Sequence, residues 1–180
     1  MGRIADNVRL AYPIVLSGLG LSIVQFFDTL MVGQVNKESL AAVAFASAII
    51  IVFLVFGQGM GMAQTPLVGQ AFARKETKRV AIIFQNAILQ NTLVGVFIVL
   101  ALLILLPFLP YLGQDAEVIK FAKPYFIATA LSLLPAQIFL AFRHFMEGVG
   151  NTKITMIIII SANILNIILN YIFIFGKLGC

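Results

Sequence analysis

Asp28 is an acidic side chain inside a long apolar segment, and it is the residue most able to carry chemistry in this sequence. The segment covers residues 11–33, and no Lys or Arg lies between Arg9 and Lys37. A helix of about 20 apolar residues is long enough to span a bilayer. An ionised Asp near the middle of such a helix costs at least about 2.5–3.5 kcal/mol on insertion scales. Such a group is usually paired, neutralised or functional, so the side chains that face Asp28 decide its role.

Three asparagines form a polar stripe on a second apolar segment, residues 154–175. Asn163, Asn166 and Asn170 are spaced i, i+3 and i+7, so on a helix they fall within an arc of about 60°. Three amides that face lipid would be costly, because hydrocarbon offers them no hydrogen-bond partners. We therefore expect this stripe to face protein or water.

The first segment has a polar face that matches this stripe. Ser17, Gln25 and Asp28 lie within about 80° of one another on a helical wheel. Asp28 lies about 9 Å beyond the midpoint of its segment, and Asn170 lies about 7.5 Å beyond the midpoint of its own. The sequence therefore predicts that the two helices face each other across a polar pocket in the outer half of the membrane, with Asn163 and Ser17 as further lining residues.

A carboxylate beside two or three amide oxygens suits two tasks. It can bind a small hard cation such as Na⁺, since hard cations take carboxylate and carbonyl oxygens. It can also hold a proton, because burial disfavours the charged carboxylate. The alternative is a hydrogen bond between Asp28 and an asparagine that only fixes helix packing, worth about 0.6–2 kcal/mol. We favour a coupling site formed by Asp28, Asn166, Asn170 and Gln25, because ionisable residues inside membranes are functional by default.

Composition and hydropathy identify the class of protein. Apolar residues make up 61% of the 180 residues and charged residues 11%, whereas soluble domains have about 25% charged residues. We predict an all-α integral membrane protein with five transmembrane helices. They are expected at residues 11–33, 40–66, 81–109, 121–142 and 154–175.

Loop charges predict the orientation of these helices. Cytoplasmic loops are enriched in Lys and Arg, and placing the N-terminus in the cytoplasm puts eight of the twelve basic residues inside. The strongest signal is the basic turn at residues 74–79, which we interpret as a topology anchor. The net charge of +5 is explained by these short loops, and no continuous basic face indicates nucleic acid.

Other motifs are less informative. Cys180 is the only cysteine and His144 the only histidine, so no disulfide framework, metal cluster or catalytic triad is expected, and we predict neither an enzyme nor a bound cofactor. Gly57 and Gly61 lie at the spacing that allows close helix packing. We hypothesise that Gln58 and Gln64 line a cavity and that Pro13 and Pro135 bend their helices.

Several stretches resemble the multidrug and toxic compound extrusion (MATE) family. They cover nearly the whole chain and occur in the same order: Pro13, residues 27–33, residues 40–43, Gln64 to Gln70, Phe142-Arg143 near Glu147-Gly148, and residues 165–177. The resemblance implies an antiporter in the cell membrane that exports small organic, often cationic, compounds in exchange for Na⁺ or H⁺. The family's carboxylate in the first helix falls on Asp28, and its polar positions in the fifth helix fall on Asn166 and Asn170. Because position 170 is Asn rather than Asp, the pattern is closer to the NorM-like branch than to the DinF-like branch.

One departure from the family concerns length. The family has twelve helices in two lobes of six, whereas five are expected here, so residues 1–180 resemble an incomplete N-terminal lobe. We predict a fragment of a longer transporter whose remaining lobe lies in the same parent chain; a half-transporter that dimerises is the alternative. Two other functions stay open, a lipid-linked oligosaccharide flippase of the same superfamily and a non-transporting membrane scaffold.

Overall fold

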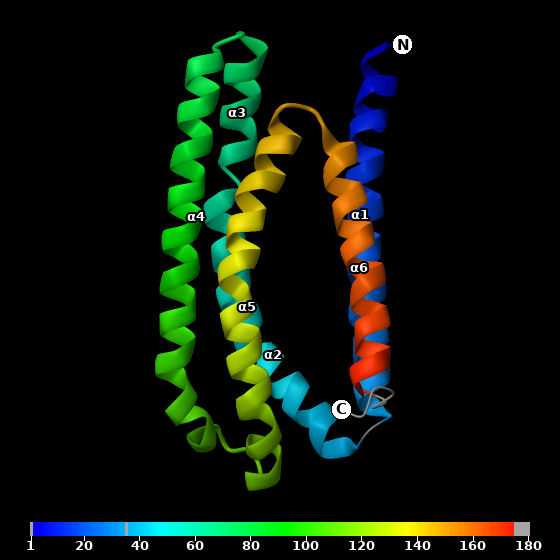
Figure 1. Cartoon of the computed structure of the whole chain (residues 1–180), viewed down its shortest axis with the longest axis vertical. Helices are drawn as coiled ribbons and strands as arrows, with labels where there is room; N and C mark the ends of the chain where they lie inside the picture. The colour runs from blue at the N-terminus through cyan, green and yellow to red at the C-terminus, as the bar shows by residue number, and fades with distance from the viewer. Residues whose placement is uncertain (1, 35, 175–180) are drawn as a thin grey trace. The chain divides into compact units, whose positions relative to one another are not determined.

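The computed structural model describes residues 2–34 and 36–174. Its helices are α1 (Gly2–Gly33), α2 (Lys37–Gly61), α3 (Gln64–Ala73), α4 (Thr77–Leu105), the 3-10 helix η1 (Leu106–Leu112), α5 (Ala116–Gly148) and α6 (Thr152–Ile174) (Figure 1). The described residues form helices joined by short turns and contain no strand. The predicted all-α membrane fold is therefore confirmed.

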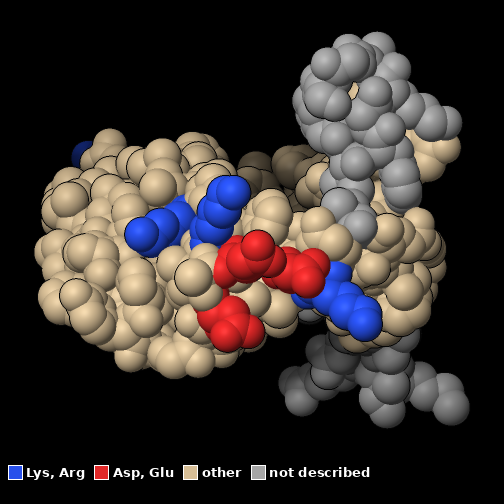
Figure 2. Space-filling view, turned by 90° about the horizontal axis from the view of Figure 1, so that it is seen from below, with Lys and Arg blue, Asp and Glu red and all other residues tan. Residues whose placement is uncertain are grey.

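Four helical stretches are long and apolar enough to cross a membrane. They are Lys37–Ala73, Thr77–Leu112, Ala116–Gly148 and Thr152–Ile172. In α1 the apolar stretch found among the described residues is the shorter Gly18–Gly33, so the span predicted at residues 11–33 stays a prediction. Seen from below in Figure 2, the Lys, Arg, Asp and Glu side chains gather near the middle of the described surface, and most of the rest carries no charge.

The helices extend beyond the apolar runs of the sequence. The fourth run was expected to cover residues 121–142, whereas α5 covers Ala116–Gly148 and continues through Pro124 and Pro135. Hydropathy marks only the part of a helix that lies in hydrocarbon, and charged turns at both ends continue the same helix. The third run instead ends early as an α-helix, because the two prolines of η1, Pro107 and Pro110, cannot donate backbone hydrogen bonds.

The chain divides into two compact units. Unit 1 contains residues 1–40 and 150–180, and unit 2 contains residues 41–149. In unit 1, α1 and α6 pack side by side and run in the same direction (Figure 1). Their buried residues include Val24 and Met31 of α1 and Ile159 of α6. This pairing is what the sequence predicted for residues 11–33 and 154–175.

Unit 2 is a bundle with an apolar core. Small and large residues alternate across it: Ala46 and Ala130 are fully buried, as are Ile98 and Phe126. The small residues let the helices approach closely, which matters because apolar burial alone does not drive helix association in lipid. Helices α3, α4 and α5 pack against one another in this unit.

The second apolar run, expected as one helix over residues 40–66, is interrupted. Helix α2 ends at Gly61, and α3 begins at Gln64 and runs to Ala73. Pro66 lies in the first turn of α3, where its missing N–H needs no helical partner. The interruption leaves backbone groups that side chains can reach inside the bundle.

Candidate functional site

Asp28 and Asn170 meet in unit 1. The Asn170 amide, on α6, donates a hydrogen bond from Nδ2 to Oδ1 of Asp28 on α1, at 2.7 Å. The same Nδ2 donates to Oδ1 of Asn166, one turn earlier on α6, at 3.1 Å. Asp28 and Asn170 are half-buried, and Asn166 is exposed. The predicted neighbours of the carboxylate are thus brought together by two parallel helices.

Local sequence explains why this contact forms. Asn166 and Asn170 are four residues apart, so on a helix their side chains lie one above the other on the same face. The face reaches α1 where that helix carries a glycine: a Cβ at Gly20 would stand 3.0 Å from Nδ2 of Asn163. The small residue permits the two helices to come close, and the longer polar side chains then meet Asp28 two turns further along.

Asn163 belongs to the same stripe but differs in its bonding. Its side chain is half-buried, and its Nδ2 is buried without a hydrogen-bond partner among the described residues. It therefore lies beside Gly20 and is not hydrogen-bonded to Asp28 in this structure. The other predicted members of this face, Ser17 and Gln25, have side chains outside the described part of the chain, as does Pro13.

The donor atoms at Asp28 limit what the site can hold. It offers one carboxylate and the amide oxygens of two asparagines, and no group of three or more acidic, His or Cys side chains occurs among the described residues. Oxygen donors of this kind suit a hard monovalent cation or a proton and do not suit a soft transition metal. The chemistry of the donor set therefore fits either of the two predicted coupling ions.

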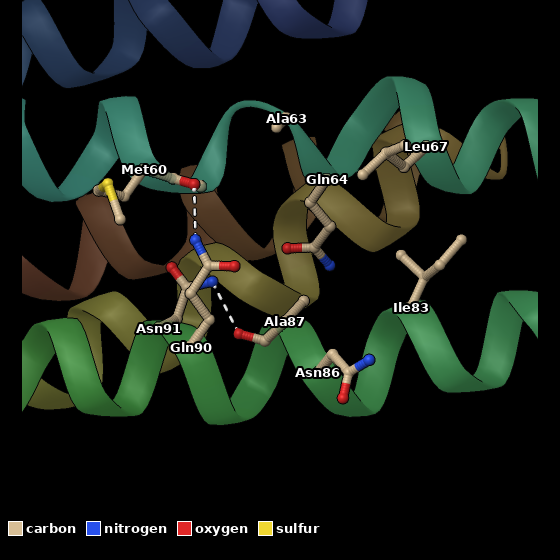
Figure 3. A pocket seen from close by; sticks show the side chains of 10 residues that line it. Met60, Ala63, Gln64, Leu67, Ile83, Asn86, Ala87, Gln90 and Asn91 are labelled. Atoms are coloured by element: carbon tan, nitrogen blue, oxygen red, sulfur yellow. Dashed lines mark hydrogen bonds between the residues drawn. The ribbon is translucent and has the colours of Figure 1, made fainter.

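A second polar region lies in unit 2 at the interruption between α2 and α3. A pocket of about 170 Å³ is lined by polar residues of α3 and α4, among them Gln64, Asn86, Gln90 and Asn91 (Figure 3). Nε2 of Gln90 donates to the carbonyl oxygen of Met60 at 3.0 Å. The backbone carbonyl freed at the end of α2 is thus satisfied by a side chain.

Gln64 is the predicted lining residue that the structure places in this pocket. Its side chain is buried, and its Nε2 donates to the carbonyl oxygen of Ala141 on α5 at 2.7 Å. Its Oε1 is buried without a partner among the described residues. Gln58 is exposed on α2, and Pro135 is exposed within a continuous α5, so their roles in cavity lining and bending stay predictions.

The predicted small-residue face of α2 packs against polar side chains of α5, and Ile98 of α4 also lies against Gly57. A Cβ at Gly57 would overlap the amide of Gln137 on α5, and a Cβ at Gly61 would stand 3.2 Å from His144. Gln137 is buried, and His144 is largely buried beside Thr65 and Glu147. Neither α5 contact was predicted from the sequence, where Gln137 stands alone among apolar residues.

The Arg143–Glu147 pair lies near the end of α5. Nε of Arg143 is 2.8 Å from Oε1 of Glu147, and Nδ1 of His144 is 3.5 Å from Oε2 of the same carboxylate. The carboxylate therefore serves two neighbours on one helical face at i−4 and i−3, a spacing at which helix side chains meet. Thr65 of α3 lies 3.2 Å from Nδ1 of His144, which ties the cluster to the neighbouring helix.

Comparison with known proteins places this architecture in a family. The MatE family profile matches residues 13–172, and the chain belongs to that family. The probable multidrug resistance protein NorM of Oceanobacillus iheyensis is 34% identical over 93% of this chain and 38% of its own length. The protein of the same name from Bacillus subtilis is 30% identical over 98% of this chain and 39% of its length. The chain is thus an α-helical, multi-pass membrane protein of the MatE family.

Solved structures share the fold. A MOP superfamily transporter from Pyrococcus furiosus superposes with a TM-score of 0.88 at 18% identity, over 96% of this chain and 38% of that one. A multidrug resistance MATE family transporter in an outward-facing conformation gives 0.86 at 19% identity, with the same coverage. In both comparisons, as with the NorM proteins, the chain spans less than two fifths of its relative's length.

Proposed function

We propose that this chain forms part of the N-terminal lobe of a multidrug exporter of the cell membrane, driven by exchange with Na⁺ or H⁺. Family membership and the NorM relatives support export. The single observation that carries the coupling role is the 2.7 Å hydrogen bond from Asn170 to Asp28. It joins the intramembrane carboxylate to a neighbouring helix, so a change in the charge or ligands of Asp28 alters a contact between α1 and α6.

Each coupling ion acts on this bond in a definite way. A proton on Asp28 removes the negative charge that makes its oxygen a strong acceptor, and the bond from Asn170 weakens. A Na⁺ ion at Asp28 requires amide oxygens, so the Asn170 amide, which now donates its N–H, must rotate to present its oxygen. Protonation therefore loosens the link between α1 and α6, whereas Na⁺ replaces the hydrogen bond with oxygen ligands from both helices. Ion occupancy is thereby converted into a change in helix packing.

Nδ2 of Asn170 bridges two oxygens, one from Asp28 and one from Asn166 at 3.1 Å. The amide of Asn170 presents its donor side to Asp28, and binding of a coupling ion requires this arrangement to change. A gradient that fills and empties the site would switch the helix pair between two different contacts at Asp28.

The substrate of the proposed exporter is a small organic compound, often cationic. Because the chain covers 38% of the first relative's length, we propose that the substrate path also uses helices outside residues 1–180. The remaining lobe in the same parent chain would supply them. Asp28 is the acidic residue within the apolar stretch Gly18–Gly33 of α1, where it is placed to respond to a cation.

The test is efflux from cells that express the transporter carrying this chain. Asp28→Asn should abolish ion-driven efflux of a cationic dye while leaving the amount of protein in the membrane unchanged. Asn163→Leu, on the same stripe but without a bond to Asp28, is the matched control and should retain efflux. Unchanged efflux in Asp28→Asn would remove the coupling role, and altered stability alone would favour a packing role.

A further inference from the structure

A groove of about 590 Å³ opens in unit 2 beside the turn between α3 and α4. Its apolar walls come from the ends of three helices, with Phe72 of α3, Val80 of α4 and Phe145 of α5 among them. Ala73 at the end of α3 also lines the groove, as do Lys75 and Glu76 of the turn and Thr77 at the start of α4. The groove therefore combines an apolar floor with a polar and charged edge, at the end of two helical stretches long enough to cross a membrane.

Aromatic packing holds the α5 wall in place. The rings of Phe84 and Phe145 are 4.4 Å apart between centroids, and Phe84 also meets Phe142 at 5.2 Å. These contacts tie α4 to α5 directly below the groove. Phe72, on the opposite wall, is 55% exposed, a large apolar surface that the described part of the protein leaves uncovered.

The turn beside the groove is strongly basic. Residues 74–79 contain four basic side chains and one acidic side chain, a net charge of +3. Arg79 pairs with Glu76 at 3.2 Å. Among the described residues, Arg74, Lys75 and Lys78 have no carboxylate within salt-bridge distance. Of these three, Lys75 lines the groove itself, so its positive charge is available to an anionic ligand.

Lys75 has a backbone conformation that disfavours its own side chain. Its φ is +58°, in the left-handed region where glycine is the usual residue. The turn is a complete Schellman motif: the N–H of Lys75 donates to Phe72 at 2.9 Å, and the N–H of Glu76 donates to Ala71 at 3.0 Å. Glycine would satisfy this backbone better, so the fold does not account for a lysine here. The position of Lys75 in the lining of the groove accounts for a lysine at this point.

We propose that this groove is a binding site for an anionic phospholipid. The ammonium group of Lys75 contacts the headgroup phosphate, and the first part of an acyl chain lies against Phe72 and Val80. The apolar walls favour a lipid over free phosphate, because free phosphate has no apolar group to bury against them. The net positive charge favours an anionic over a zwitterionic headgroup, since basic clusters beside membrane helices attract anionic lipids.

The experiment measures lipid retained by the full chain in an uncharged detergent, by native mass spectrometry. Phosphatidylglycerol and phosphatidylcholine are added in equal amounts. Wild type should retain one phosphatidylglycerol in preference to phosphatidylcholine. Lys75→Gly should reduce that preference about fivefold, the effect of one basic residue near an anionic headgroup. The glycine also suits the backbone, so misfolding does not explain the loss.

Two further variants separate a built site from general electrostatic attraction. Ala73→Phe fills the groove and keeps all four basic side chains of the turn, and it should lose phosphatidylglycerol retention. Lys123→Gln removes one exposed charge near the start of α5 and should bind as wild type does. Equal losses in Lys75→Gly and Lys123→Gln, or wild-type retention in Ala73→Phe, would overturn the proposal.

Discussion

Replacing Asn170 with Leu tests the link between α1 and α6 directly. The substitution removes the 2.7 Å hydrogen bond to Asp28 and the 3.1 Å bond to Asn166. Hydrogen bonds to charged groups contribute about 1.5–3 kcal/mol in soluble proteins, and those between membrane helices about 0.6 kcal/mol on average with a maximum near 1.7. Because Asp28 is half-buried and its acceptor would be left unpaired, we expect Asn170→Leu to destabilise the helix pair by about 1–2 kcal/mol.

Asn163→Leu is the matched control for this measurement. It makes the same change about two turns earlier on the same face of α6. The Nδ2 of Asn163 is buried without a partner among the described residues. Removing an unpaired buried donor relieves a desolvation cost. We therefore expect no destabilisation, or a gain of about 1 kcal/mol.

Hydrogen exchange read by mass spectrometry is the suitable assay, because it reports local opening separately in each part of a chain with two compact units. Peptides from α1 and α6 should exchange faster in Asn170→Leu and not in Asn163→Leu, while α4 and α5 peptides stay unchanged. Equal effects of the two substitutions would refute the assignment of the Asp28 contact. An unchanged rate in Asn170→Leu would show that the hydrogen bond contributes nothing to packing.

Two further substitutions test other structural features. Gly57→Ala should destabilise unit 2 by about 1–3 kcal/mol, because a Cβ there overlaps Gln137. Gly59→Ala is the control: a Cβ there has nothing within 4 Å, so this variant should be neutral or stabilising in a thermal melt. Equal melting temperatures for the two variants would contradict this expectation. Lys75→Gly should stabilise the α3–α4 turn by about 1 kcal/mol, the cost of a left-handed non-glycine residue, and a lower melting temperature would refute the backbone argument.

The pairing of α1 with α6 could be predicted from the sequence for a specific physical reason. Polar groups in hydrocarbon must find hydrogen-bond partners, and the apolar segments of this sequence contain only a few polar side chains. Helical periodicity gave the faces of Asp28 and of Asn166 and Asn170, and the rise per residue gave similar depths. Two independent coordinates, angle and depth, are enough to predict that two side chains meet.

The polar contacts inside unit 2 could not be predicted in this way. Gln137 is a single amide on α5 with no stripe around it, so periodicity gave no face to match with Gly57. The interruption between α2 and α3 was also hidden, because Gly61 and its neighbours read as part of one apolar run. Helix ends were missed for a related reason: hydropathy marks the segment in lipid, and charged turns such as Arg143 to Glu147 continue α5 beyond it.

The orientation of the helices also stays a prediction. It depends on where the basic turn at residues 74–79 lies relative to the two sides of the membrane, which loop charge indicates and backbone geometry alone does not. The proposed lipid site depends only on the groove and on the charge beside it. It therefore holds for either orientation.

The most direct test of the account is infrared difference spectroscopy of the Asp28 carboxyl group, measured on the reconstituted chain. Na⁺ is added at constant pH in one series, and pH is lowered without Na⁺ in the other. If Asp28 is the coupling site, one of the two series changes a carboxyl band that is present in wild type and missing in Asp28→Asn. An asparagine amide band should change at the same time, and Asn170→Leu should remove that change. A spectrum in which no Asp28-dependent band responds to either ion would contradict the coupling role.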